Sequence, residues 1–132
     1  MSKKVLIVDD DKDIRALISA AIVFIGCTVT EAKDGREGFE LAKNEEFDLV
    51  IVDGLLPKMS GHDFCKEIRK YKNMDELPII FMSGLFKGYK NYKMIIEECK
   101  ANDFVEKPID AGKLLIKVKT ILKLQKKVSN EQ

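Results

Sequence analysis

Reactive side chains follow four short apolar segments of this sequence. Three consecutive acids, Asp9–Asp11, end the first apolar run, and Asp53, Ser83 and Lys107 come at the ends of three later ones. Three or more carboxylates in one cleft repel one another, which raises a pKa unless a cation neutralises them. A hard divalent ion is the natural partner of such a cluster, because Mg²⁺ prefers oxygen ligands. If these four ends meet, they predict a Mg²⁺ site.

Lys107 indicates more than metal binding. A lysine beside a metal site competes with the ion, so its presence makes sense if an anion arrives there. Lys107 as a point charge, Ser83 as a hydroxyl donor and Mg²⁺ as a Lewis acid together suit the equatorial oxygens of a phosphoryl group. Asp53 would then be the nucleophile that attacks phosphorus in line and forms an acyl phosphate. Any one of these residues could equally be a helix cap, a turn residue or a surface charge; their joint placement favours phosphoryl chemistry.

Apolar segments typical of strands alternate with amphipathic segments typical of helices along the whole chain. The predicted strands are Val5–Val8, Cys27–Thr30, Phe47–Val52, Leu77–Met82 and Phe104–Val105. Five βα units in this order imply an α/β fold with one parallel sheet, covered on both sides and joined by right-handed crossovers. Ligands of such sheets bind beyond the carboxyl ends of the strands, so the reactive ends could converge on one pocket.

Local signals predict where the helices begin and end. Gly26 is the expected C-cap of the first helix, and Asp34 and Asp110 are expected N-caps of the second and fifth. Apolar residues at helical spacing predict a third helix reaching Tyr71 and a fourth that carries Tyr92 to Cys99 on one face.

The composition is that of one folded domain. A length of 132 residues fits a single domain, 45% hydrophobic residues are too many for a disordered chain, and 34% charged residues are too many for a membrane protein. The longest apolar runs fall far short of the roughly 20 residues that span a bilayer. Neither a membrane segment nor export is indicated, and we expect a cytoplasmic protein with a domain over residues 1–127 and a polar tail over 128–132.

Cysteine usage and charge exclude further classes. Cys27, Cys65 and Cys99 are odd in number and form no CxxC pair, so buried reduced thiols are expected rather than disulfides or zinc ligands. The net charge of +1 gives no electrostatic footprint for nucleic acid. The excess of lysines in the second half is typical of solvated helix faces.

The motifs around these residues resemble those of response-regulator receiver domains of the CheY-like superfamily, from Lys3 to about Leu124. The matching segments are VLIVDDD, LVIVDGLLPKMSG, PIIFMSG and DFVEKP. The resemblance implies a doubly wound, flavodoxin-like sheet of order 2-1-3-4-5 with five helices. It also makes Asp53 the phospho-acceptor in a two-component signalling domain.

The resemblance implies further roles at the same site. Asp10 would bind Mg²⁺, or Mn²⁺ in its place, directly, and Asp9 would bind it through water. Asp53 and the backbone carbonyl of Leu55 would complete the protein ligands. Lys107 would be the catalytic lysine, joined to Pro108 by a peptide bond that is usually cis in the family. Three mild departures from the family pattern affect switching strength and phosphoryl lifetime, not the core chemistry: Ser83 for threonine, Phe104 for tyrosine and the small Gly54 after the acceptor.

Signalling follows from the same resemblance. Phosphorylation would draw Ser83 toward the phosphoryl group and turn Phe104 inward, which would shift the surface of the fourth helix, fifth strand and fifth helix. The single histidine, His62, offers no internal donor, so a sensor histidine kinase, a histidine phosphotransfer protein or a small acyl phosphate would supply the group. Phe86, Tyr89 and Tyr92 make a dimer or output partner on that surface a further hypothesis.

Three alternatives remain. A phosphatase or phosphotransferase could use a nucleophile within Asp9–Asp13, but Asp13 occupies the place where that class has a threonine. A flavin carrier would need a hydroxyl- and glycine-rich loop after the first strand, where this chain has acids. A degenerate receiver would bind partners without phosphorylation. Replacing Asp53 by asparagine distinguishes the first alternative, and beryllofluoride with Mg²⁺ tests the last.

Overall fold

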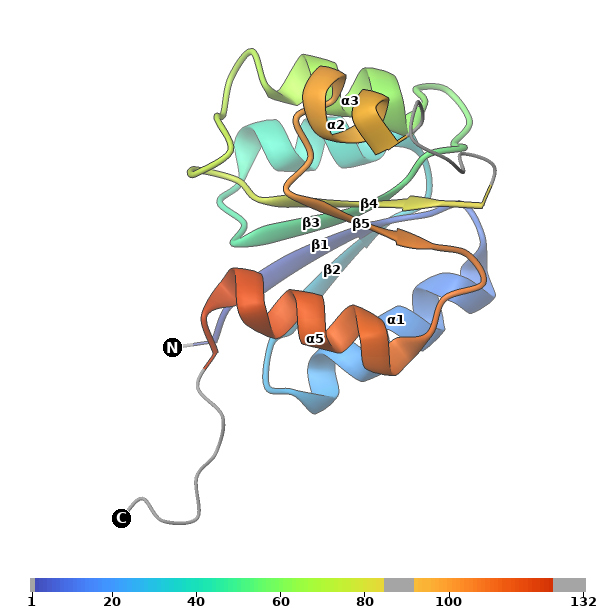
Figure 1. The fold of residues 1–132 in the computed structure, drawn as a ribbon, viewed down its shortest axis with the longest axis vertical. Helices are drawn as coiled ribbons and strands as arrows, with labels where there is room; N and C mark the ends of the chain where they lie inside the picture. The colour runs from blue at the N-terminus through green and yellow to red at the C-terminus, as the bar shows by residue number, and fades with distance from the viewer. Residues whose placement is uncertain (1, 85–91, 125–132) are drawn as a thin grey trace.

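A parallel sheet of five strands forms the centre of the molecule (Figure 1). This computed structural model describes residues 2–84 and 92–124. The strands are β1 (Lys4–Val8), β2 (Thr28–Ala32), β3 (Leu49–Asp53), β4 (Ile79–Ser83) and β5 (Asp103–Glu106). They lie in the order β2-β1-β3-β4-β5 and every neighbouring pair is parallel. The predicted α/β fold and its strand order are therefore confirmed.

Helical segments cover both faces of this sheet. The segments are α1 (Lys12–Phe24), α2 (Gly35–Asn44), α3 (Gly61–Ile68), the π-helical η1 (Met94–Glu98) and α5 (Ala111–Leu122). In Figure 1, α1 and α5 lie below the sheet, whereas α2, α3 and η1 lie above it. Leu6 and Val8 of β1 face the upper core, and Val5 and Ile7 face the lower one. Both faces of the strand are buried, which explains its uninterrupted apolar sequence.

The helix caps agree closely with the local signals. The Asp34 carboxylate accepts a hydrogen bond from the Glu37 amide at the start of α2, and Asp110 caps α5 in the same way, as predicted. At the end of α1 the prediction is wrong by one residue, because Ile25 is the C-cap and Gly26 follows it with φ +94°. Glycine adopts this left-handed conformation without strain.

Two predicted helices differ from the structure. The third ends at Ile68, so Tyr71 lies beyond it with 58% of its surface exposed. The fourth contains a π-helical turn, in which the Cys99 amide donates to the Met94 carbonyl five residues earlier. Phe86 and Tyr89 lie outside the described residues.

Arg69, directly after α3, connects several segments on the upper side of the sheet. Its guanidinium donates to the backbone carbonyls of Lys72, Asn73, Leu77 and Lys100 at 2.7 to 3.2 Å. It also donates to the Asn102 side chain at 3.1 Å. The end of α3, the approach to β4 and the approach to β5 are thus joined through one side chain.

Two predictions from composition can also be compared with the structure. Cys27, Cys65 and Cys99 are buried and free of disulfide bonds, as expected. Over residues 2–84 and 92–124, no helix has the length and apolar character needed to cross a bilayer.

Candidate functional site

The sheet brings the four reactive strand ends to one edge. Asp9 follows β1, Asp53 ends β3, Ser83 ends β4 and Lys107 follows β5. Asp53 is in register with Met82 of β4, and Ser83 is in register with Glu106 of β5. Asp9, Asp53 and Ser83 are 0%, 5% and 3% exposed, although the first two have carboxyl side chains. Burying charges is unfavourable unless they are paired, so their partners decide what this edge can do.

Lys107 joins the two buried acids. Its Nζ lies 3.1 Å from Asp9 Oδ2 and 3.1 Å from Asp53 Oδ2. Asp10 is exposed, yet Asp9, Asp10 and Asp53 can each offer one carboxylate oxygen within 4.8 Å of the other two. Three hard oxygen donors at this spacing fit Mg²⁺ or Mn²⁺, which take carboxylate and water ligands. One lysine shared by two of them leaves the cluster with an excess of negative charge that a divalent cation can neutralise.

The environment of Asp53 makes its ionised form unfavourable. Burial raises the pKa of its carboxyl above the ordinary value of 3.8, and the negative charge of Asp9 raises it further. The hydrogen bond and charge of Lys107 act in the opposite direction, as does the backbone amide of Leu55, but they do not compensate fully. For Lys107 the balance is reversed. Burial would lower its pKa, but the hydrogen bonds and charges of Asp53 and Asp9 together raise it above 10.5, so the lysine stays charged.

The raised pKa of Asp53 predicts a pH-dependent effect on stability. A carboxyl whose pKa rises on folding costs no stability below its ordinary pKa and costs most above its folded pKa. In EDTA, Asp53→Asn should therefore be more stable than the wild type at neutral pH, and the gain should shrink as the pH falls toward 3.8. Urea unfolding at several pH values measures the difference. Glu46→Gln, on a side chain that is 96% exposed, is the control and should show no such trend.

The loop after β3 returns close to Asp53. The Gly61 amide donates to the Gly54 carbonyl at 3.1 Å, and the Gly54 amide donates to the Met82 carbonyl at 2.8 Å. A Cβ on Gly61 would overlap the Asp53 carbonyl oxygen and lie 2.7 Å from Gly54 Cα. Only glycine permits this approach, which holds the start of α3 against the end of β3.

Gly61→Ala should consequently destabilise the domain and displace the loop that follows β3. We expect a loss of about 1 to 3 kcal/mol in the free energy of unfolding, the usual cost of overpacking. Urea denaturation measures the loss, and amide NMR shifts around Asp53 report the displacement. Gly112→Ala in α5 is the matched control, because its Cβ would meet only Asp110 Oδ1, at 3.3 Å. Equal effects of the two substitutions would contradict the prediction.

The remaining predicted site residues lie around this edge. Leu55 is 57% exposed, and its backbone amide hydrogen-bonds to the Asp53 carboxyl. Ser83 is buried, and its carbonyl accepts from the Lys107 amide at 2.8 Å. The peptide bond between Lys107 and Pro108 is cis, as the resemblance implied.

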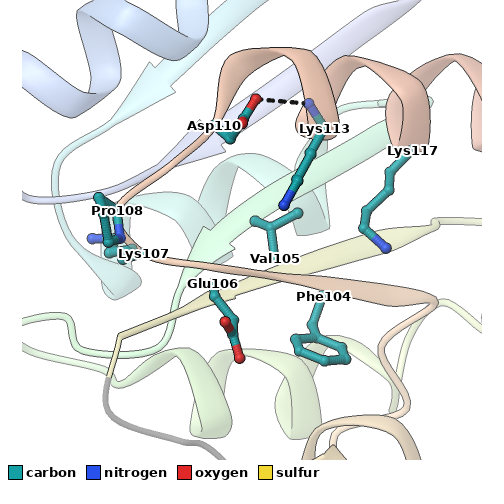
Figure 2. Close-up of a pocket in the computed structure, with 8 residues that line it drawn as sticks. All are labelled: Phe104, Val105, Glu106, Lys107, Pro108, Asp110, Lys113 and Lys117. Atoms are coloured by element: carbon teal, nitrogen blue, oxygen red, sulfur yellow. Dashed lines mark hydrogen bonds between the residues drawn. The ribbon is translucent and has the colours of Figure 1, made fainter.

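Phe104 precedes Lys107 in the chain, within β5, and packs against an aromatic ring instead of the acidic cluster. Its ring meets the ring of Tyr92 edge-on, with centroids 5.2 Å apart. Phe104 lines a depression of about 420 Å³ together with Lys113 and Lys117 of α5. Figure 2 shows these three side chains. Phe104 is in register with Phe81, two residues before Ser83 on β4. Neighbours in register share a face of the sheet, so Ser83 and Phe104 lie on one face, a single pleat apart.

Two residues near the site were missed by sequence reasoning. Asp11 caps α1 by accepting hydrogen bonds from the Asp13 and Ile14 amides. Arg15 donates to the Asp9 carbonyl at 2.8 Å. An aspartate before a helical pattern could have indicated the cap. No sequence signal reveals which carbonyl a helical arginine will reach.

Comparison with protein families gives one match over most of the chain. The family model of the response regulator receiver domain matches residues 5–119. Among curated proteins, the alkaline phosphatase synthesis transcriptional regulatory protein PhoP of Bacillus subtilis is 34% identical over 93% of this chain and 50% of its own length. The DNA-binding dual master transcriptional regulator RpaA of Synechocystis is 31% identical over 91% of this chain and 49% of its own. The chain thus spans about half the length of the curated relatives it matches.

Solved structures agree with this match along nearly their entire length. The CheY-like receiver domain protein of Methanospirillum hungatei superposes with a TM-score of 0.83 at 28% identity, covering 93% of this chain and 95% of that one. The chemotaxis response regulator CheY4 of Vibrio cholerae gives a TM-score of 0.82 at 29% identity, covering 92% and 99%.

Proposed function

This chain belongs to the response regulator receiver domain family of two-component signalling, and we propose that it accepts a phosphoryl group on Asp53. One observation carries the proposal. Asp53 shares Lys107 with Asp9 at 3.1 Å on each side, and Asp9, Asp10 and Asp53 each place one carboxylate oxygen within 4.8 Å of the other two. A nucleophile, a positive charge and oxygen ligands for a cation are thereby within reach of one incoming phosphoryl group.

The proposed reaction forms one bond and breaks another. An Asp53 carboxylate oxygen attacks phosphorus with a lone pair while the bond from phosphorus to the donor breaks, and the electron pair of that bond returns to the donor. The donor is a phosphohistidine of a sensor histidine kinase or of a histidine phosphotransfer protein, or a small acyl phosphate. Family membership and the absence of any histidine but His62 from the sequence support an external donor.

The surrounding residues would stabilise the charge that develops on the phosphoryl oxygens. Lys107, held between Asp53 and Asp9, supplies a fixed positive charge at the point of attack. The Ser83 hydroxyl, at the end of β4, would donate to a second oxygen. Asp9, Asp10, Asp53 and the Leu55 carbonyl would hold the Mg²⁺ or Mn²⁺. When bound, such an ion withdraws negative charge from the phosphoryl oxygens and offsets repulsion between them and the acids.

The output would pass from Ser83 to Phe104. Phosphorylation adds roughly −1.5 to −2 charge at Asp53, and Ser83 would move toward it. Phe104 would then leave Tyr92 and turn inward, changing the surface formed by η1, β5 and α5. The position of both residues on one face of neighbouring strands supports this route. A dimer partner or an output partner or domain would bind the changed surface.

The domain is a signalling component rather than an enzyme with a separate substrate. We propose that it catalyses only its own phosphorylation and slow dephosphorylation, in the cytoplasm. The receiver would occupy residues 1–127, with 128–132 as a tail, and would bind no nucleic acid or membrane itself. The names of the regulators PhoP and RpaA support transcription as the output that this domain would control.

Acetyl phosphate tests the function without knowledge of the kinase. Incubation with acetyl phosphate and Mg²⁺ should add the mass of one phosphoryl group, as seen by intact-protein mass spectrometry, and EDTA should prevent the addition. Beryllofluoride should shift amide NMR signals near Ser83 and Phe104 only when Mg²⁺ is present. A protein that stays unmodified and shows no shift at saturation would be a degenerate receiver, and the proposal would be wrong.

A further inference from the structure

The backbone amide and carbonyl of Asp9 both form hydrogen bonds with residues outside the cluster of Asp9, Asp10 and Asp53. The β1 ladder ends at Val8, which is in register with Ala32 on one side and Val52 on the other. Beyond that point the Asp9 amide still donates to the Ala32 carbonyl, at 3.1 Å. The Asp9 carbonyl instead accepts from a side chain, Arg15 Nη1 of α1, at 2.8 Å.

This carbonyl belongs to the peptide bond that joins Asp9 to Asp10, the two acids offered to a cation. Fixing the plane of that peptide restricts the directions in which both side chains leave the backbone. The Asp9 carboxylate is itself held at Oδ1 by the Asp11 amide at 2.8 Å and at Oδ2 by Lys107. The hydrogen bond from Arg15 therefore adds a restraint on the Asp9 carbonyl to those on the Asp9 carboxylate.

Arg15 is oriented in turn by two residues remote from the cluster. Its Nε donates to Glu31 Oε1 of β2 at 3.0 Å, and Ser19 Oγ donates to Glu31 Oε2 at 2.9 Å. Arg15 and Ser19 are one helical turn apart, so both contact the same strand residue. The planar guanidinium directs Nε to Glu31 and Nη1 to the Asp9 carbonyl, a fixed two-way geometry that a lysine could not reproduce.

We propose that Arg15 is a positioning residue that sets the Mg²⁺ affinity of the acidic site through the Asp9 carbonyl, with Glu31 and Ser19 holding it in place. The inference rests on the proposed function, because it assumes that Asp9 and Asp10 serve a cation. It assigns Arg15 no contact with the phosphoryl group.

A purely electrostatic role predicts the opposite result. A positive charge near the cluster opposes cation binding, so its removal would strengthen Mg²⁺ binding. Pairing with Glu31 and partial exposure, 17% for the Arg15 side chain and 42% for Glu31, weaken that effect. Loss of an outer hydrogen-bond partner of a metal ligand commonly costs about 10- to 100-fold in metal affinity. The direction in which Mg²⁺ affinity changes therefore distinguishes a positioning role of Arg15 from an electrostatic one.

The test titrates Mg²⁺ into the unphosphorylated full chain and follows amide NMR shifts. Arg15→Met should weaken binding about 10-fold. Arg15→Lys should restore only part of the loss, and Ser19→Ala should weaken binding less. The exposed Arg36→Met is the matched control and should bind as the wild type does. At saturating Mg²⁺, all variants should take up phosphoryl from acetyl phosphate at the wild-type maximal rate.

Several outcomes would overturn the inference. Unchanged or tighter Mg²⁺ binding by folded Arg15→Met would exclude positioning. If that variant does not fold, unchanged binding by both Arg15→Lys and Ser19→Ala would exclude it equally. If the wild type binds Mg²⁺ and takes up phosphoryl, and the variants bind Mg²⁺ equally well, only this inference is refuted. A wild type that does neither refutes the proposed function as well.

Discussion

Asp53→Asn is expected to abolish phosphoryl uptake from acetyl phosphate, with a fall in rate of at least about 100-fold. Asparagine keeps the size of the side chain but has no anionic oxygen to attack phosphorus. Lys107 keeps Asp9 as a partner at 3.1 Å, so the fold around the site should persist. Intact-protein mass spectrometry after timed incubation with Mg²⁺ measures the rate, and near-wild-type circular dichroism verifies the fold.

The same variant separates the proposal from a phosphatase-like alternative. A nucleophile within Asp9–Asp13 would still form a phosphoenzyme in Asp53→Asn. The phosphorylated peptide would then be the one that contains the end of β1. Asp63→Asn, at an exposed acid in the first turn of α3, is the control for loss of a carboxylate as such. Undiminished phosphoryl uptake by Asp53→Asn would show that Asp53 is not the nucleophile.

Arg69→Met should lower the free energy of unfolding by about 3 to 5 kcal/mol, more than Gly61→Ala does. The substitution leaves carbonyls of Lys72, Asn73, Leu77 and Lys100 without their charged donor. Hydrogen bonds to charged groups contribute about 1.5 to 3 kcal/mol each, but several of these share one guanidinium and are not additive. Since whole domains are stable by about 5 to 15 kcal/mol, this variant would approach the limit of folding.

Urea denaturation of Arg69→Met and Arg69→Lys measures the effect. Lysine keeps the charge but reaches fewer of the carbonyls, so it should recover only part of the stability. Lys70→Met is the neighbouring control, because its ion pair with Glu67 lies on the surface and should contribute nothing measurable. A loss for Arg69→Met no larger than for Lys70→Met would show that the carbonyls find other donors.

The strands were predictable, with ends that differ from the structure by at most two residues, because their signals are local. The continuous apolar sequence of β1 follows from burial on both faces, and the placement of Asp53 and Ser83 at strand ends follows from the segment boundaries. Asp34 and Asp110 were predictable as caps because the cap bond spans only three residues. The strand order came from the family resemblance, since the apolar segments themselves do not say which strands are neighbours.

Contacts between distant segments were not predictable. Arg69 reaches residues up to 33 positions away, and Arg15 reaches a strand 16 positions away. Neither pairing leaves a pattern in a single sequence, because arginine on a helix is ordinarily a solvated residue. The π-helical turn at Met94–Glu98 has the same apolar spacing as an α-helix over so short a stretch, so periodicity could not distinguish the two.

The single pleat between Ser83 and Phe104 has a consequence for protein engineering. Because Phe81 and Phe104 are in register, as are Ser83 and Glu106, the four side chains lie on one face of two neighbouring strands. A chimera that exchanged β5 and α5 while retaining β4 would combine side chains from two different proteins on this face. Transplants between receivers should therefore carry both strands together, and substitutions at positions 81 and 104 should be selected as pairs.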